Sequence, residues 1–81
     1  MKVRVRYFAS LRETVGLEQE EFELAAGSSV EHLLAALAGA HRGLDTRLAA
    51  VRAAVNRCYV SMGTLLKDGD EVALVPPVGG G

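Results

Sequence analysis

Alternating apolar and polar positions predict that the chain begins with a β-strand. Over residues 2–9, Val3, Val5 and Tyr7 fall on one face, whereas the intervening basic residues and Phe8 fall on the other. Successive side chains of a strand point to opposite sides of a sheet, so the apolar side can be buried while the basic side remains exposed to solvent. We expect the valine face to join the core and the basic face, with Phe8 at its end, to remain outside.

A second strand is predicted over residues 18–24, where Phe22 and Leu24 share a face. The segment between the two strands, residues 10–16, fits a helical turn that ends at Gly16. Basic residues crowd the first strand and glutamates crowd the second, so antiparallel pairing would place opposite charges across from each other. We therefore interpret both charge clusters as cross-strand partners rather than as binding surfaces.

A helical periodicity follows and predicts the main helix of the chain. Ser28 and Glu31 have the spacing of a capping box, in which each side chain bonds the backbone of the other residue. Gly43 is a suitable terminator. The apolar residues between them recur at the interval of one helical face: Val30, Leu33, Leu34, Leu37 and Ala38. We expect a helix that begins at Ser28 and ends near Gly43.

Residues 44–52 allow two interpretations, either a short helical stripe or a turn that leads into a strand. A third strand is predicted over residues 53–56. Residues 58–60 either continue that strand or return beside it after a turn near Asn56 and Arg57.

The last regular element is a strand over residues 71–75, preceded by a turn over residues 67–70 whose Gly69 can take a positive φ. The order of elements predicts an α+β domain, in which a mixed sheet carries the main helix across one face. In the β-grasp version of this fold, the first and last strands are parallel neighbours at the centre of the sheet. We predict such a domain over residues 1–75, followed by an extended tail over residues 76–81.

The predicted tail differs chemically from the rest of the chain. Pro76 and Pro77 fix φ and lack an N–H, so they end sheet pairing and extend the chain. Gly79, Gly80 and Gly81 have no Cβ and can thread a narrow channel. Glycine-rich chain ends are often flexible and inert. Here the predicted strand over residues 71–75 leads directly into the tail, which favours a tail whose terminal carboxylate is the substrate of an enzyme.

Composition narrows the class of protein. The chain has 81 residues, of which 49% are hydrophobic and 23% are charged, with a formal net charge of −1. This balance indicates one small globular domain and argues against a nucleic-acid binder, which is usually basic. We see neither a long apolar run nor a secretory signal, so we expect a cytoplasmic protein without a membrane segment.

The few residues with nucleophilic or metal-binding potential do not form a recognisable site. Cys58 is the single cysteine, and its apolar strand neighbours predict a buried core thiol. His32 and His41 are expected at the surface or at the ends of the main helix. Their spacing with Cys58 does not suggest zinc, so we expect no metal and no catalytic centre.

Three segments together resemble the family of small, sulfur-carrying subunits of molybdopterin synthase, which have a ubiquitin-like β-grasp fold. The first is Tyr7-Phe8-Ala9-Ser10-Leu11-Arg12-Glu13. The second is Ala54-Val55-Asn56, followed by Leu65 and then by Lys67-Asp68-Gly69-Asp70-Glu71-Val72. The third is Pro76-Pro77-Val78-Gly79-Gly80-Gly81. The resemblance covers essentially the whole chain.

This resemblance implies a chemical role for Gly81. A ubiquitin-activating-like enzyme, using its own ATP and magnesium, would adenylate the Gly81 carboxylate, and a sulfur donor protein would convert it to a thiocarboxylate. The carrier would then dock on the large synthase subunit, within a heterotetramer, and give its sulfur to cyclic pyranopterin monophosphate. The chain itself would be non-catalytic and would bind no cofactor.

The resemblance also implies which residues are recognised. The tail would be read through Pro76, Pro77, Val78, Gly79 and Gly80. The surface that faces the large subunit would include Phe8, Arg12, Tyr59 and Val75.

Other functions for the same tail remain open at this point. The chain could carry sulfur for thiamine, cysteine or tRNA thiolation, or it could be a ubiquitin-like modifier joined to proteins through Gly81. A plain binding module with an inert tail is the remaining alternative.

Overall fold

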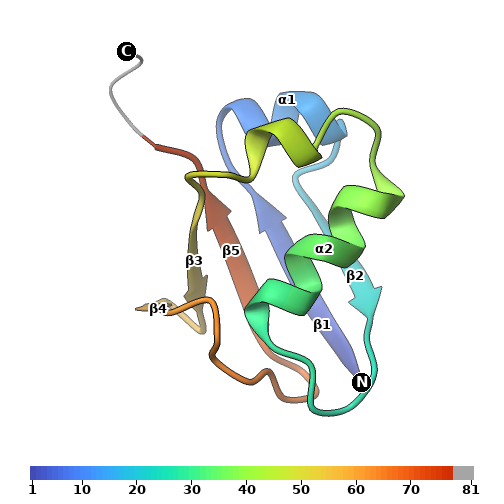
Figure 1. Ribbon diagram of the computed structural model, residues 1–81, viewed down its shortest axis with the longest axis vertical. Coiled ribbons are helices and arrows are strands. Elements are labelled where there is room, and N and C mark those ends of the chain that lie inside the picture. Colours follow the sequence, from blue (N-terminus) through green and yellow to red (C-terminus); the bar gives the residue numbers. More distant parts are fainter. Residues whose placement is uncertain (78–81) are drawn as a thin grey trace.

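The computed structural model describes residues 1–77 and shows a five-stranded mixed sheet with one long helix across one face (Figure 1). Its elements are β1 (Lys2–Tyr7), α1 (Ser10–Val15), β2 (Gln19–Glu23), α2 (Val30–Ala40), the 3-10 helix η1 (Asp45–Arg47), β3 (Arg52–Val55), β4 (Cys58–Val60) and β5 (Glu71–Val75). The short elements α1 and η1 lie together at the end of the sheet where β1 and β5 finish (Figure 1).

The sheet has the β-grasp topology that the sequence predicts. Its strand order is β2-β1-β5-β3-β4. The first and last strands are parallel neighbours at the centre, with Val5 beside Val72 and Tyr7 beside Leu74. Both β2 and β3 run antiparallel to the central strands. The predicted charge pairing is also confirmed in register, because Arg4 lies opposite Glu21.

The N-cap of helix α2 lies one residue later than predicted, and the predicted Ser28–Glu31 capping box is wrong. The cap is Ser29, whose hydroxyl accepts a hydrogen bond from the backbone N–H of His32 at 3.3 Å. The Nδ1 atom of His32 accepts in return from the Ser29 N–H at 3.0 Å. Ser28 is unavailable because its hydroxyl donates to the Ala25 carbonyl in the preceding turn.

The C-terminal end of α2 also differs from the prediction. The helix ends at Ala40, and the N–H of His41 closes it by bonding the Leu37 carbonyl at 2.9 Å. Gly43 lies beyond the helix, at φ +82°, in the turn that leads to η1.

The segments that the sequence left ambiguous adopt a turn and a hairpin. Residues 44–51 contain the short helix η1 and a turn that leads into β3, which starts at Arg52, so each of the two interpretations holds for part of the segment. Strand β4 returns antiparallel beside β3, with Val55 opposite Cys58. The connection is a two-residue turn in which Asn56 and Arg57 have φ values of 50° and 74°.

The core fills the layer between α2 and the sheet. The large fully buried side chains come from the inner face of the sheet, from α2, from α1 and from the residue that precedes η1: Val3, Val5, Tyr7, Val72, Leu74, Val30, Leu33, Leu37, Leu11 and Leu44. The prediction that Cys58 is a buried thiol is wrong, since this residue is exposed. Its strand is the short outer edge of the sheet, and α2 crosses away from it (Figure 1), so no layer covers the thiol.

Two further properties concern the described part of the chain as a whole. Among residues 1–77, no helix combines the length and the apolarity that crossing a membrane requires. The same residues contain no group of three or more His, Cys, Asp and Glu side chains arranged to hold a metal ion.

Candidate functional site

The predicted tail leaves from the end of a central strand. Strand β5 pairs with β1 on one side and with β3 on the other, so its direction is held by two hydrogen-bonded neighbours. It ends at Val75, and Pro76 and Pro77 follow outside the sheet, as expected of residues that cannot donate to a ladder. The remaining predicted tail residues, Val78, Gly79, Gly80 and Gly81, lie outside the described residues.

The sheet face opposite α2 brings together three of the four predicted partner-binding residues. Directly paired residues share a face, and Val75 pairs with Arg52, whereas its neighbour Leu74 pairs with the inward-facing Ala53. Tyr59 pairs with Ala54, which alternates with Ala53 and therefore also lies on the outer face.

Phe8 joins the same face. It follows the inward-facing Tyr7 at the end of β1, and the outward-facing guanidinium of Arg6 lies 5.3 Å from the centre of its ring. We name this surface the outer patch and define it by Phe8, Ala54, Tyr59, Ala73 and Val75. Because it adjoins the point where β5 ends, a protein that engages the predicted tail would meet this patch as well.

Arg12, the fourth predicted partner-binding residue, is not part of the outer patch. It lies on α1 and its guanidinium is 3.6 Å from the Glu18 carboxylate. Both side chains are largely exposed, so this ion pair contributes little to stability. Arg12 lines a separate shallow hollow with Ala9, Ser10 and Glu13.

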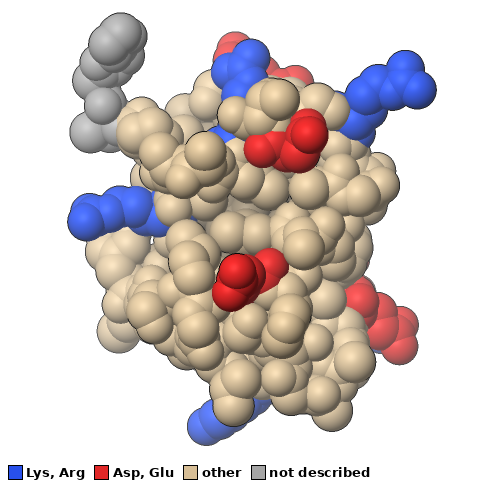
Figure 2. All heavy atoms as spheres, viewed as in Figure 1, with Lys and Arg blue, Asp and Glu red and all other residues tan. Residues whose placement is uncertain are grey.

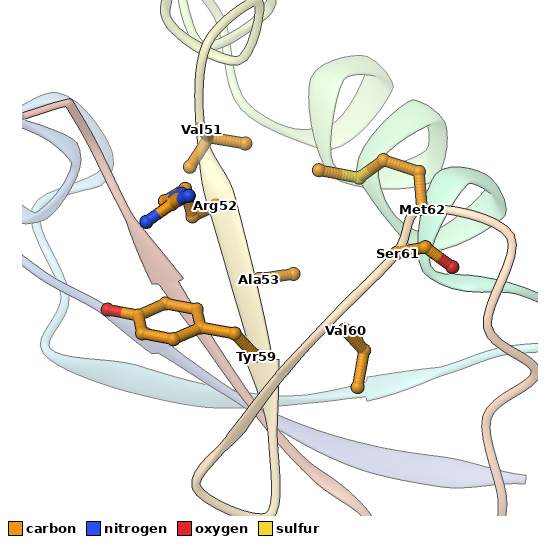
Figure 3. Close-up of a pocket in the computed structure, with 7 residues that line it drawn as sticks. All are labelled: Val51, Arg52, Ala53, Tyr59, Val60, Ser61 and Met62. Carbon is orange, nitrogen blue, oxygen red and sulfur yellow. The ribbon is translucent and has the colours of Figure 1, made fainter.

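Arginine side chains lie over both aromatic rings of the outer patch. The guanidinium carbon of Arg52 is 5.4 Å from the centre of the Tyr59 ring, within the range of a cation–π contact. Figure 3 shows Arg52 and Tyr59 on one side of β3, and Val60 and Met62 on the other. The contact of Arg52 with Tyr59 was not predicted from the sequence, because it depends on a strand register that the pattern left open.

The hollow drawn in Figure 3 is an open notch at the β3–β4 edge of the sheet. Its lining residues are Val51, Arg52, Ala53, Tyr59, Val60, Ser61 and Met62. Small-molecule sites usually enclose most of their ligand. A notch lined from both faces of an edge hairpin is better suited to contact with another protein surface.

A polar cluster that the sequence did not predict lies between the sheet and the end of α2. The Tyr7 hydroxyl donates to Oε2 of Glu20 at 2.5 Å, and Nε2 of His41 lies 2.6 Å from the same oxygen. The Tyr7 and His41 rings meet edge to face, with centres 6.1 Å apart. Burial raises the pKa of the Tyr7 phenol, and the hydrogen bond and negative charge of Glu20 raise it further.

This cluster ties three elements together and lies on the side of the sheet opposite the outer patch. It joins β1, β2 and the residue that caps α2. Figure 2 shows the helix-bearing side of the molecule, on which the charged groups of the described residues are scattered. The geometry therefore assigns the cluster to the stability of the fold.

The chain matches the profile of the ThiS family over residues 5–81. It is 43% identical to the molybdopterin synthase sulfur carrier subunit of Chlamydomonas reinhardtii, and the alignment covers 100% of both chains. It is 38% identical to the protein of the same name from Mycobacterium tuberculosis, over 100% of this chain and 99% of that one.

Solved structures agree with these relatives. SAMP1 from Haloferax volcanii superposes with a TM-score of 0.90 at 29% identity, over 100% of both chains. A protein assigned as subunit 1 of molybdopterin converting factor from Pyrococcus furiosus gives 0.88 at 38% identity, covering 96% of this chain and 99% of that one. A chain from the complex of subunits 1 and 2 of molybdopterin-converting factor from Helicobacter pylori gives 0.71 at 30% identity, over 100% of both.

Proposed function

The chain belongs to the ThiS family, and from this premise we propose that it is the sulfur carrier subunit of a molybdopterin synthase. The observation that carries the proposal is the 43% identity, over both full lengths, to a protein of that name. The fold supports it, because the central strand β5 leads directly into the proline pair that begins the predicted tail.

The proposed chemistry takes place at Gly81. A carboxylate is a poor acyl donor because its oxygen leaves badly. In the first step, a Gly81 carboxylate oxygen attacks the α-phosphate of ATP on a separate activating enzyme, and pyrophosphate leaves. In the second step, the outer sulfur of a cysteine persulfide on a donor protein attacks the acyl carbon, and AMP leaves. A second thiol then attacks the donor's cysteine sulfur and breaks the S–S bond of this acyl disulfide, so that a disulfide forms on the donor side and a thiocarboxylate is released at Gly81.

Sulfur transfer would follow on the large synthase subunit. The outer patch would dock there while the tail delivers its sulfur to the pterin substrate, and two deliveries would complete one dithiolene. The role of this chain is to carry and position the acyl group. ATP, magnesium and the catalytic side chains belong to the partner proteins in this scheme.

Intact-mass measurement tests the proposed chemistry. Incubation with the activating enzyme, ATP, magnesium and a sulfur source is expected to add the mass of one oxygen-to-sulfur exchange. Deletion of Gly81 should abolish this gain. A deletion variant that still gained it would disprove the assignment of the reactive carboxylate.

Cys58 provides the matched control, because it is exposed and could itself take up sulfur as a persulfide. A persulfide adds a sulfur without losing an oxygen, so the two products differ in mass. The Cys58→Ser variant is expected to charge like the parent protein. Loss of charging in that variant would place the acquired sulfur on the thiol instead of on Gly81.

Protein modification is a second candidate function. The likeness to SAMP1 favours it, because that name stands for small archaeal modifier protein 1. The same activated acyl group could pass to lysine amines of other proteins. Higher-mass conjugates of the tagged chain in cell extract, lost when Gly81 is deleted, would support this role. Co-purification distinguishes the proposed role from sulfur carriage in another thiolation pathway. Only the proposed role requires the tagged chain to bring down a large molybdopterin synthase subunit.

A further inference from the structure

The charged residues of the outer sheet face are divided between its two ends. At the end remote from the tail, basic residues of β1 have acidic neighbours: Lys2 lies opposite Glu23, and Arg4 lies between Glu21 and Glu71. The rows nearest the tail are different.

One row of laterally paired residues runs across the strands from Arg6 through Ala73 and Ala54 to Tyr59. In the next row, Val75 pairs with Arg52. The charged members are both arginines. The end of the face that adjoins the tail is therefore cationic, whereas the remote end has charges of both signs.

Arg52 carries the less compensated of these two charges. Arg6 lies 3.9 Å from the Glu71 carboxylate, so its charge already has a partner. Within the described residues, no Asp or Glu oxygen lies within 4.0 Å of the Arg52 guanidinium. Its contact is the Tyr59 ring, which is itself 63% exposed.

A guanidinium stacked on an aromatic ring is held in place while the N–H groups at its rim remain available. Arginine is suited to bidentate hydrogen bonding with a carboxylate, and little side-chain entropy is lost when the group is already ordered. Tyr59 supplies a large apolar surface next to it, and tyrosine and arginine are both enriched among the interface residues that carry most of the binding energy.

We propose that Arg52 and Tyr59 form one recognition element, which binds a carboxylate side chain beside an apolar surface on the large synthase subunit. The position of Arg52 favours this assignment, because it pairs with Val75, the last strand residue before the proline pair. A partner that holds the tail must pass this point. The inference rests on the proposed function, since it specifies the chemistry of the partner that the outer patch would meet.

Binding of the purified full-length chain to the large subunit from the same organism tests this inference. Arg52→Glu is expected to raise the Kd at least about ten-fold at low salt, because the new glutamate would face the carboxylate of the partner. Arg52→Gln should have a smaller effect, and Arg52→Lys should bind more weakly than the parent because lysine lacks the planar fork. The difference between Arg52→Glu and the parent should shrink as salt is raised.

Arg42→Glu is the matched control. It makes the same change in net charge at an exposed residue, in the turn after α2, away from the outer patch. It is expected to bind like the parent. A circular dichroism melt of each variant checks that the fold is kept, and Arg52→Gln provides a second test if Arg52→Glu does not fold.

The outcomes separate the inference from the proposed function. If the parent binds and both Arg52→Glu and Arg52→Gln bind equally well, the inference is wrong and the proposed function stands. If the parent fails to bind the large subunit, the proposed function fails, and the inference with it. If sedimentation shows that the chain alone self-associates and that Arg52→Glu abolishes this, the patch is covered by a second copy and the inference is again wrong.

Discussion

The Tyr7 hydroxyl lies inside the domain, where a phenol needs a partner. This O–H donates to the Glu20 carboxylate, which also contacts His41, so one carboxylate serves residues from β1 and from the end of α2. Among residues 1–77, every buried side-chain nitrogen or oxygen has a hydrogen-bond partner. The cost of burying this polar group is therefore met locally.

Alkaline titration of stability tests this account of Tyr7. Because folding raises the pKa of the phenol above its ordinary value of about 10, the folded state keeps a proton that the unfolded state releases. The contribution of Tyr7 should be fully present below pH of about 10 and fall above it, by up to about 1.4 kcal/mol per pH unit. Urea unfolding measured from pH 8 upward gives this slope.

Tyr7→Phe removes the titrating group. It is expected to lose about 1 kcal/mol at neutral pH, since Glu20 keeps its contact with His41 but loses a donor. The alkaline decline should then be shallower than in the parent. Tyr59→Phe, at an exposed ring outside the cluster, is the control and should retain the decline. Equal slopes in Tyr7→Phe and the parent would contradict this account.

At the scale of elements, the β3–β4 hairpin places two non-glycine residues in the left-handed region. A two-residue turn of type I′ needs positive φ at both central positions, and Asn followed by Gly is the preferred pair. The chain has Asn56 and Arg57 there, at φ 50° and 74°. The second position therefore carries a backbone cost that glycine would avoid.

Arg57→Gly is expected to stabilise the domain by about 0.5–1 kcal/mol, or to raise Tm by a few degrees. Asn56→Gly is the matched control in the same turn. The Asn56 amide donates to Asp70 at 2.9 Å and its carbonyl accepts from the Glu71 N–H at 3.0 Å, so its removal should destabilise. Thermal melts of both variants decide the matter, and a loss of stability in Arg57→Gly would refute the explanation.

Periodicity predicted most of the elements, because each strand and the main helix must bury a face. It could not choose between Ser28 and Ser29 as the helix cap, since that depends on which hydroxyl the preceding turn already uses. It also misplaced Cys58. Apolar neighbours indicate a strand, but whether that strand is covered depends on its position in the sheet.

The candidate site shows the same limit. Phe8, Tyr59 and Val75 were identified through a family resemblance. The register places Tyr59 and Val75 on one face, and the contact with Arg6 places Phe8 there as well. The stacking of Arg52 on Tyr59 needs the β3–β4 pairing, and the contact of His41 with Glu20 needs the end of α2 to lie over β2. Both are tertiary facts that one sequence does not contain.

For the whole molecule, the two faces of the sheet differ in what covers them: α2 packs on the inner face, and the outer face carries the outer patch. The inner face and α2 form the core, whereas the outer face carries the patch next to the tail. Strand β5 belongs to both, because its residues alternate between the faces. Substitutions at adjacent residues of β5 should therefore have different consequences.

Leu74 and Val75 test this separation. Leu74 is fully buried, so Leu74→Ala is expected to cost about 2–5 kcal/mol. A domain of this size has in total only about 4–12 kcal/mol, so much of that variant should unfold at moderate urea, yet the folded fraction should bind the large subunit normally. Val75→Ala should cost under about 1 kcal/mol, because its side chain is only partly buried on the outer face, and should weaken binding about ten-fold. Urea midpoints and Kd values are measured on the same samples. Equal losses of stability in the two variants, or a Val75→Ala variant that bound like the parent, would contradict the separation of the core face from the binding face.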